Sequence, residues 1–281
     1  MVSARCSECG STAVYREGGR RRGLCARCLS KALEGKVRRY LARRGDLTPS
    51  ERVLVALIGG TKSLVCLDLL LRVERRWPSA RVAALAVRRA GEEKNAGVVE
   101  LAAEEVGAEV VGCAEVGGDW GLSSALEVCL RAAAQLRFTS LAVPLTLDDC
   151  VVMWTASFLR GAGYGLPWRV GEVKVLLPLA RVSLKEALAY ALVRGLPMVR
   201  PSGGLGRVEE VVAGLMYDLE AGNPGLKFGL VSSLERLREL RGAAERPPGS
   251  TPIHGGALDS QLRPGGPRTP PSALRAAPFR A

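Results

Sequence analysis

Four cysteines near the amino terminus constrain the fold of this chain more than any other feature. Cys6, Cys9, Cys25 and Cys28 follow the spacing C-x2-C-x15-C-x2-C, which is typical of a structural zinc site. Two such pairs supply four thiolates and leave no open position for a substrate water. A module of about 30 residues buries too little apolar surface to fold without a bound metal or another cross-link. The pattern therefore predicts a zinc-ribbon-like module over residues 1–30, with zinc in a structural role.

Two disulfides are the alternative use of these four cysteines. No secretory signal precedes them, and a C-x2-C pair bridges poorly to itself, so we favour zinc. The other four cysteines lie in apolar segments and are interpreted as small buried hydrophobic residues. No apolar run reaches the ~18 residues of a membrane span. We therefore expect a cytoplasmic protein without membrane contact.

Positive charge is concentrated on the first 50 residues. The net charge is +12, and residues 1–50 hold twelve Lys or Arg against four Asp or Glu. This balance favours a polyanionic partner, and we expect RNA, in particular tRNA. A solvated basic face is the alternative. The candidate RNA-binding residues are Arg20, Arg21 and Arg22 between the cysteine pairs and Arg38, Arg39, Arg43 and Arg44 on one side of a predicted helix.

Histidine is almost absent from the chain. The single one is His254, in the carboxyl-terminal tail. Triads that depend on histidine and catalytic metals bound by histidine are therefore excluded from the folded part. No catalytic residue is assigned from the sequence.

Beyond residue 50, short apolar runs alternate with helical patterns. Strands are predicted at 52–58, 81–87, 109–113, 139–143 and 172–177, and helices at 61–77, 92–106, 123–136, 147–159 and from about Ser183. This alternation predicts an α/β fold with a doubly wound parallel sheet. Two further helices are expected at 208–220 and 231–240. The predicted divisions are the zinc module 1–30, a basic helix and linker 31–50, the α/β domain 51–200, carboxyl-terminal helices 201–241, and a disordered Pro/Gly-rich tail 242–281.

A double glycine follows the first predicted strand of the α/β domain. Backbone N–H groups of such a loop can approach an anion, and the following helix start favours negative charge. The loop matches neither the Walker pattern nor G-x-G-x-x-G, and ordinary strand–helix packing is the alternative. If it binds a nucleotide, the candidate residues are Gly59, Gly60, Thr61, Lys62 and Ser63.

The motifs together resemble a known family. The double C-x2-C module, the basic helix, PSERVLVAL, IGGTKS and LTLDD occur in the order seen in PP-loop ATP pyrophosphatases, whose fold is adenine nucleotide alpha hydrolase-like. The most similar members are the tRNA 2-thiouridine synthetases of the TtuA type and the cytoplasmic tRNA thiolation subunits. The resemblance covers residues 1–240. The resemblance implies that the enzymes of this family use ATP, with magnesium, to adenylate a tRNA uridine. Sulfur then displaces AMP. The resemblance also adds Asp148 and Asp149 to the nucleotide site and a ubiquitin-like sulfur carrier to the partners.

Several positions depart from the family pattern. The PP-loop reads S-G-G-x-D-S, whereas Ile58 stands at the first serine and Lys62 at the aspartate. A donor to phosphate and a contact to magnesium are thereby lost. The mid-chain cysteine pair of TtuA-type enzymes would fall near 117–121 and the later cysteine near 201–203, and neither is present. A second zinc module and the Gly-His pair before the aspartates are also missing. These losses argue against ATP and magnesium as cofactors.

Three functions are consistent with the sequence. The first is tRNA wobble-uridine 2-thiolation, with this chain as a degenerate, non-catalytic or weakly catalytic tRNA-binding subunit that dimerises with itself or with an active paralogue. The second is an ATP-dependent tRNA-adenylating sulfurtransferase. The third is a zinc-containing nucleic-acid-binding protein unrelated to thiolation. An ATP-binding measurement with and without magnesium would separate the second from the other two.

Overall fold

The fold is described from a computed structural model of the chain. It describes residues 5–17, 22–43, 48, 50–58, 60–74, 80–91, 93–117, 120–162, 166–167, 169–200 and 204–244. Within these ranges, no helix is long and apolar enough to cross a lipid bilayer.

The amino-terminal module is a small hairpin followed by a long helix. Strand β1 (Tyr15–Arg16) pairs antiparallel with β2 (Gly23–Leu24), and α1 (Ala26–Arg43) follows directly. The sequence predicted a helix from residue 31, so α1 starts five residues earlier. Its buried stripe explains the difference, because the stripe already includes Leu29 one turn before Leu33. Helix α1 therefore belongs both to the cysteine module and to the main domain.

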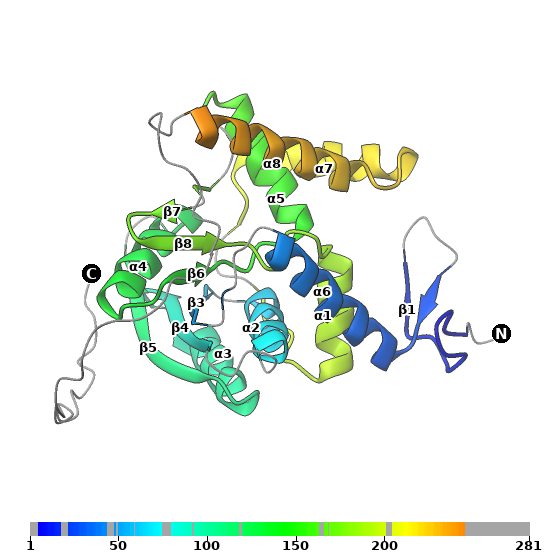
Figure 1. The fold of residues 1–281 in the computed structure, drawn as a ribbon, viewed down its shortest axis with the longest axis horizontal. Coiled ribbons are helices and arrows are strands. Elements are labelled where there is room, and N and C mark those ends of the chain that lie inside the picture. The colour runs from blue at the N-terminus through cyan, green and yellow to red at the C-terminus, as the bar shows by residue number, and fades with distance from the viewer. Residues whose placement is uncertain are drawn as a thin grey trace, which may run out of the picture.

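A six-stranded sheet forms the centre of the molecule (Figure 1). Its strands are β3 (Arg52–Leu57), β4 (Arg81–Arg89), β5 (Glu109–Val116), β6 (Ser140–Ala142), β7 (Arg169–Val170) and β8 (Val173–Leu176). Their order is β5-β4-β3-β6-β8-β7, with every neighbouring pair parallel except β7 and β8. The predicted α/β class with a parallel sheet is confirmed. The sequence did not predict β7, since both of its residues are exposed and show no apolar pattern.

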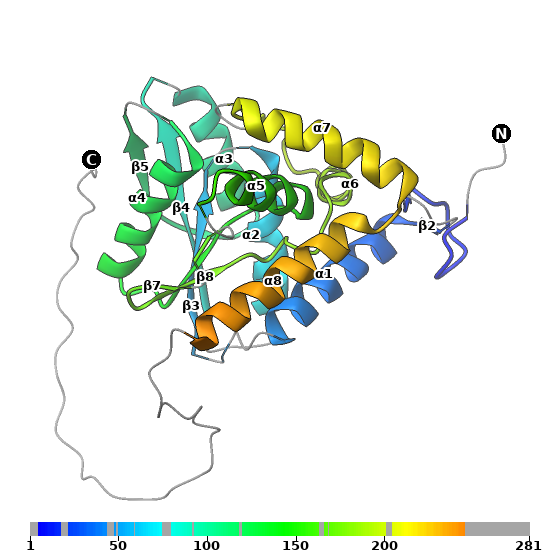
Figure 2. The ribbon, with the colours of Figure 1, turned by 90° about the horizontal axis from the view of Figure 1, so that it is seen from above.

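Seven further helices are described around this sheet (Figures 1 and 2). They are α2 (Thr61–Glu74), α3 (Glu93–Glu105), α4 (Leu122–Gln135), α5 (Leu147–Leu159), α6 (Leu184–Arg194), α7 (Arg207–Gly222) and α8 (Leu226–Ala244). Helices α2 and α3 contact each other beside β4, whereas α4 packs against β3, β4, β5 and β6. Right-handed crossovers place α4 on the opposite face, because the strand order reverses after β5. The sheet is thus covered on both faces.

The ends of α8 differ from those predicted. It begins five residues before 231 and continues to Ala244, so residues 242–244 are helical rather than part of a tail. The rest of the predicted tail lies outside the described residues. Helix α6 starts where the sequence predicted, directly after Ser183. Ser183 and Glu186 form a capping box there, since Ser183 Oγ accepts from the backbone N–H of Glu186 and the Glu186 carboxylate accepts from the backbone N–H of Ser183.

A buried carboxylate holds the amino ends of three central strands together. Glu51 precedes β3 and is only 2% exposed. It accepts hydrogen bonds from Ser140 Oγ at 2.7 Å and Lys174 Nζ at 2.9 Å, from β6 and β8, and from Thr139. Burial alone would raise its pKa, but the hydrogen bonds from Thr139, Ser140 and Lys174 outweigh burial and lower the pKa to about 2. The charged form is therefore the one that the fold stabilises.

This network predicts a pH-dependent contribution to stability. The pKa of Glu51 is lower in the folded chain, about 2 against a reference value of 4.5. Its contribution, about 3 kcal/mol at most, is present above pH 4.5 and is lost as the pH falls through about 2. When urea unfolding is measured from pH 6 to pH 2, the free energy of unfolding should therefore fall less steeply with decreasing pH for Glu51→Gln than for the wild type. Glu109→Gln, at an exposed ion pair with Arg81, should follow the wild-type curve. Parallel curves for the wild type and Glu51→Gln would contradict the assignment.

Candidate functional site

The four amino-terminal cysteines converge on one point. Their sulfur atoms all lie within 4.8 Å of one another. The Cys9 sulfur is 3.5 Å from that of Cys25 and 3.6 Å from that of Cys28. Four thiolates at 2.3 Å from a tetrahedral zinc ion would be about 3.8 Å apart. All eight cysteines of the chain are free thiols, so the geometry fits a single metal ion and not a pair of disulfides.

Local structure explains this convergence. Cys6 opens a turn in which its carbonyl accepts from the N–H of Gly10 at 2.9 Å, and the positive φ of +74° at Gly10 suits glycine. Cys25 immediately precedes α1, and Cys28 lies in its first turn. At Cys9, the hydrogen bond with the Ser11 side chain is the main cause that lowers the pKa, to about 6. A backbone hydrogen bond from Cys25 is the main cause that lowers the pKa of Cys6, whereas desolvation raises the pKa of Cys28 to about 12. The module itself therefore favours the deprotonated form at Cys6 and Cys9, and a bound metal would have to displace the proton of Cys28.

Those of the predicted RNA-binding arginines that the structure describes do not form one surface. Arg22 is held within the cysteine module by ion pairs to Glu8 and, at 3.9 Å, to Glu17. Arg38 lines a hollow between α1 and α2. Arg39 and Arg43 line a different groove, between α1 and α8. The arginines at 20, 21 and 44 lie outside the described residues.

The glycine loop lies where the strand order of the sheet reverses. Strand β3 neighbours β4 on one side and β6 on the other, and the loops after β3 and β6 meet at their carboxyl ends. Ligands of open α/β sheets bind at such a switch point. Gly60 has a positive φ of +81°, which allows the tight turn into α2 at Thr61. Gly59 lies outside the described residues.

The start of α2 is occupied by another segment of the chain. The backbone N–H of Thr61 donates to the carbonyl of Val199 at 3.0 Å. The Thr61 hydroxyl donates to the carbonyl of Pro197 at 3.1 Å and accepts from the N–H of Val199 at 2.8 Å. Both polar groups of Thr61 are therefore satisfied within the protein, and its N–H is not directed at a ligand. The segment 197–199 thus lies against the loop that the resemblance assigns to pyrophosphate.

Lys62 forms an ion pair with one of the two candidate aspartates. Its ammonium lies 2.8 Å from both carboxylate oxygens of Asp149, and each side chain is 22% exposed. Asp149 also accepts from the N–H and the hydroxyl of Thr146 at 2.8 Å and 2.7 Å, in the capping box that starts α5. The pattern T-x-x-D at residues 146–149 is a sequence signal for this box, and it was not among the predictions.

The second aspartate is neutralised in the same way. Asp148 accepts from the backbone N–H of Leu184 at 2.6 Å, at the start of α6. It also accepts from Lys227 Nζ at 2.7 Å, from α8. No sequence signal links Lys227 to this position, because 79 residues separate the partners. The structure therefore brings Lys62 to Asp149 and Lys227 to Asp148, so each carboxylate is paired with an ammonium.

This arrangement is poorly suited to a divalent cation. Magnesium binds through one or two carboxylates and its remaining waters. Here both carboxylates already have a cationic partner and a helix-start N–H or hydroxyl donor. A magnesium ion would have to displace two ammonium groups that have already compensated the negative charge. The residues present fit a closed ionic network and do not fit the magnesium site that the resemblance implies.

Two comparisons place this geometry among known proteins, and no family profile matches the chain. A tRNA-5-methyluridine(54) 2-sulfurtransferase of Pyrococcus horikoshii is 24% identical, with 84% of this chain and 83% of that protein covered. The solved U34-tRNA thiolase NcsA of Methanococcus maripaludis, which contains a [4Fe-4S] cluster, superposes with a TM-score of 0.70. It is 23% identical and covers 85% of this chain and 88% of its own. This chain has the fold of that thiolase, and both proteins agree with the resemblance drawn from the motifs.

Replacing the lysine of the network should create the cation site that is missing. In Lys62→Asp, a second carboxylate would face Asp149, and the pair would repel unless a cation binds. We expect magnesium to raise the melting temperature of Lys62→Asp, by an amount equivalent to roughly 1–3 kcal/mol near saturation, and to leave the wild type unchanged. Lys62→Ala, which removes the ammonium without adding a carboxylate, is the matched control. An equal magnesium effect on the wild type would show that the network does open to the cation.

Proposed function

We propose that this chain takes part in tRNA wobble-uridine 2-thiolation as a non-catalytic or weakly catalytic tRNA-binding subunit. The observation that supports this most directly is the neutralisation of Asp148 and Asp149 by Lys227 and Lys62. The chain shares its fold with a tRNA thiolase, and its cation site is closed. Both features are expected of a catalytically degenerate subunit that works beside an active one. The partner would be a second copy of the chain or an active paralogue. A sulfur carrier and a cytoplasmic location remain predictions from the resemblance.

An active sulfurtransferase is the second candidate. It is favoured by the extent of the similarity, since both tRNA-modifying relatives align over more than four fifths of their length. Such an enzyme would have to bind ATP without the serine and aspartate of the PP-loop. It would also need a sulfur source that uses no cysteine near 117–121 or 201–203. Nucleotide turnover separates this candidate from the first.

The deciding experiment measures nucleotide chemistry in the wild-type chain. With ATP, magnesium and tRNA, we expect no tRNA-dependent release of AMP and pyrophosphate. The double variant Ile58→Ser/Lys62→Asp should bind ATP more tightly, because it regains a phosphate donor and a carboxylate. It should still not thiolate tRNA, because the cysteines that handle sulfur are absent. Robust AMP release by the wild type alone would reject the subunit proposal and favour the enzyme.

We further propose that the cysteine site holds zinc. The sulfurs lie close enough together for one tetrahedral ion, whereas the thiolates of a [4Fe-4S] cluster each bind a different iron atom and must stand further apart. Four thiolates leave no open coordination position, so the metal would be structural. Its binding energy, roughly 10 kcal/mol or more, would then support the folding of the hairpin and the start of α1.

Elemental analysis tests the zinc assignment. Protein purified without chelator should contain one equivalent of zinc and little iron, and it should lack the visible absorbance of an iron–sulfur cluster. Cys25→Ser should reduce the zinc content to well below half an equivalent, since one of four ligands is lost. Cys113→Ser, outside the cysteine module, should keep full occupancy. Wild-type protein with less than half an equivalent of zinc, or with stoichiometric iron, would contradict the assignment.

A further inference from the structure

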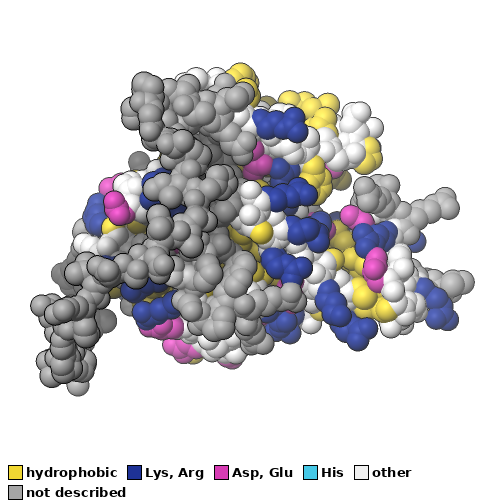
Figure 3. All heavy atoms as spheres, in the orientation of Figure 1, with side chains coloured by type: hydrophobic (Ala, Val, Ile, Leu, Met, Phe, Trp, Pro, Cys, Tyr) yellow, Lys and Arg dark blue, Asp and Glu magenta, His cyan; other side chains and the backbone are white. Residues whose placement is uncertain are grey.

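A groove of about 510 Å³ runs between α1 and α8. Its lining contains five basic side chains and one exposed aromatic ring. These residues are Lys36, Arg39, Arg43, Arg181, Phe228 and Arg236. Figure 3 shows Lys and Arg side chains in a row over α1 that continues toward α8. The groove therefore joins two helices that are far apart in sequence into one positively charged surface.

The inner wall of the groove is fixed by internal contacts. Arg181 donates to Ser232 Oγ at 2.9 Å and to the Phe228 carbonyl at 3.2 Å, and it forms an ion pair with Glu235. The Tyr40 hydroxyl donates to the same Glu235 carboxylate at 2.6 Å. The acid in the groove is thus already neutralised. These contacts also connect α1 to α8 and set the distance between the two walls.

The rim of the groove carries unpaired positive charge. Arg39 and Arg43 are exposed and stand one turn apart on the same face of α1. Arg236 is exposed on α8. Within the described part of the chain, none of the three has a carboxylate partner. Each guanidinium can therefore form two parallel hydrogen bonds to a phosphate group without breaking an existing ion pair.

The groove also offers an aromatic surface. The Phe228 ring is 36% exposed and lies at the edge of α8, with the ammonium of Lys36 at 5.7 Å from its centroid. A nucleic-acid base can stack on an exposed ring beside a basic track, and this combination is typical of surfaces that bind unpaired nucleotides. An acidic peptide would use the arginines but would gain nothing comparable from the ring.

We propose that the α1–α8 groove is the principal RNA-binding site of the protein. The arginines of the rim hold consecutive phosphates, and Phe228 stacks on the base of an unpaired nucleotide. This inference rests on the proposed tRNA-binding function and specifies where and how the RNA is bound. Of the residues that the sequence suggested, it keeps Arg39 and Arg43 and not Arg38, and it adds Lys36, Phe228 and Arg236.

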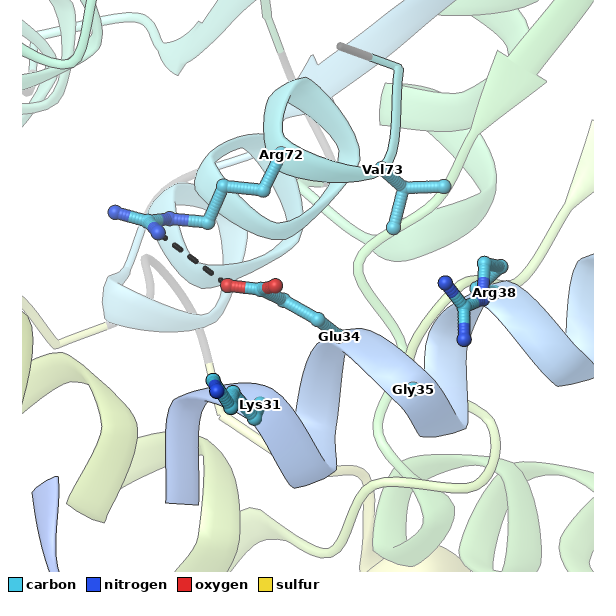
Figure 4. Close-up of a pocket in the computed structure, with 6 residues that line it drawn as sticks. All are labelled: Lys31, Glu34, Gly35, Arg38, Arg72 and Val73. Atoms are coloured by element: carbon cyan, nitrogen blue, oxygen red, sulfur yellow. Dashed lines mark hydrogen bonds and ion pairs between the residues drawn. The ribbon is translucent and has the colours of Figure 1, made fainter. Parts of the chain in front are cut away.

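The opposite side of α1 provides a built-in comparison. The hollow between α1 and α2 has a volume of about 310 Å³ and is lined by Lys31, Glu34, Arg38 and Arg72. Figure 4 shows the Glu34 carboxylate directed at Arg72, and the two groups are 3.3 Å apart. Arg72 also pairs with the buried Asp68 at 3.1 Å. Each cavity thus has one acid in its lining, and each acid is ion-paired. Within the described residues, the hollow has two cations without a carboxylate partner, against three at the groove, and it has no aromatic ring, so we assign the RNA to the α8 side.

Two double variants on opposite sides of α1 test the assignment. Arg39→Ala/Arg43→Ala and Lys31→Ala/Arg38→Ala each remove two positive charges from the same helix. Binding of the full, metal-loaded chain to a tRNA transcript is measured by anisotropy over a range of salt concentrations. The first variant should weaken binding and lower the log–log salt slope by about 1.4–1.8, which corresponds to two lost phosphate contacts. The second should leave both quantities close to those of the wild type.

Variants on α8 test the second wall independently. Arg236→Ala should lower the salt slope by about 0.7–0.9, as expected for one contact. Phe228→Leu keeps an apolar side chain but removes the stacking ring. It should weaken binding to RNA with unpaired nucleotides by roughly fivefold or more, with the salt slope unchanged and with little effect on a fully paired duplex. Thermal unfolding verifies that each variant is folded before its affinity is compared.

The outcomes separate the groove from the function on which it rests. Wild-type protein that does not bind tRNA at low salt would remove both the proposed function and this site. Wild-type binding that survives Arg39→Ala/Arg43→Ala, or that is lost equally with Lys31→Ala/Arg38→Ala, would overturn the groove and leave the function standing. Competition by polyglutamate as strong as that by RNA of equal charge would also overturn it and indicate an acidic protein partner.

Discussion

The ion pair between Lys62 and Asp149 joins the two loops that meet at the centre of the parallel sheet. Helices α2 and α5 both begin there, and the partial positive charges of their first turns add to the Lys62 ammonium. Without Asp149, this concentration of positive charge would require an anion from solution. The carboxylate supplies that anion from within the chain, and Lys227 and Asp148 repeat the arrangement one position along α5. The crevice is therefore electrically balanced in the absence of any ligand.

Charge balance at the crevice contrasts with charge excess elsewhere. The strands and the switch point have the geometry of an open, mainly parallel α/β sheet. In the part of the chain that the structure describes, Arg39, Arg43 and Arg236 have no carboxylate partner and line a groove on the other side of α1 from the Lys31–Arg38 hollow. A closed ionic network at the switch point and an open basic groove elsewhere are the two features from which we proposed an RNA-binding subunit and not an independent enzyme.

The sequence predicted those features that depend on local pattern. Continuous apolar runs predicted β3 and its neighbours, and the double glycine predicted the turn between β3 and α2. The two aspartates were added by the family resemblance and not by a local pattern. The early start of α1 was missed because Leu29 and Cys28 were assigned to the cysteine module rather than to the helix. Contacts between distant segments could not be predicted. The pairing of Lys227 with Asp148 and the position of Val199 against Thr61 depend on how separate helices and loops pack, and no local periodicity encodes them.

Helix α1 connects the metal centre to the groove, and its burial shows how far the two depend on each other. Its first turn contains Cys28 and depends on the cysteine site. From Leu33 onward, the buried stripe packs within the main hydrophobic core, and Leu33 and Leu41 have no exposed surface at all. The Tyr40–Glu235 hydrogen bond further anchors the carboxyl-terminal half of α1 to α8. The walls of the groove are thus set by the core of the α/β domain and by the contact between α1 and α8. Leu33, Leu41 and the Tyr40–Glu235 pair lie outside the cysteine site, so the geometry of the groove does not depend on the four cysteines.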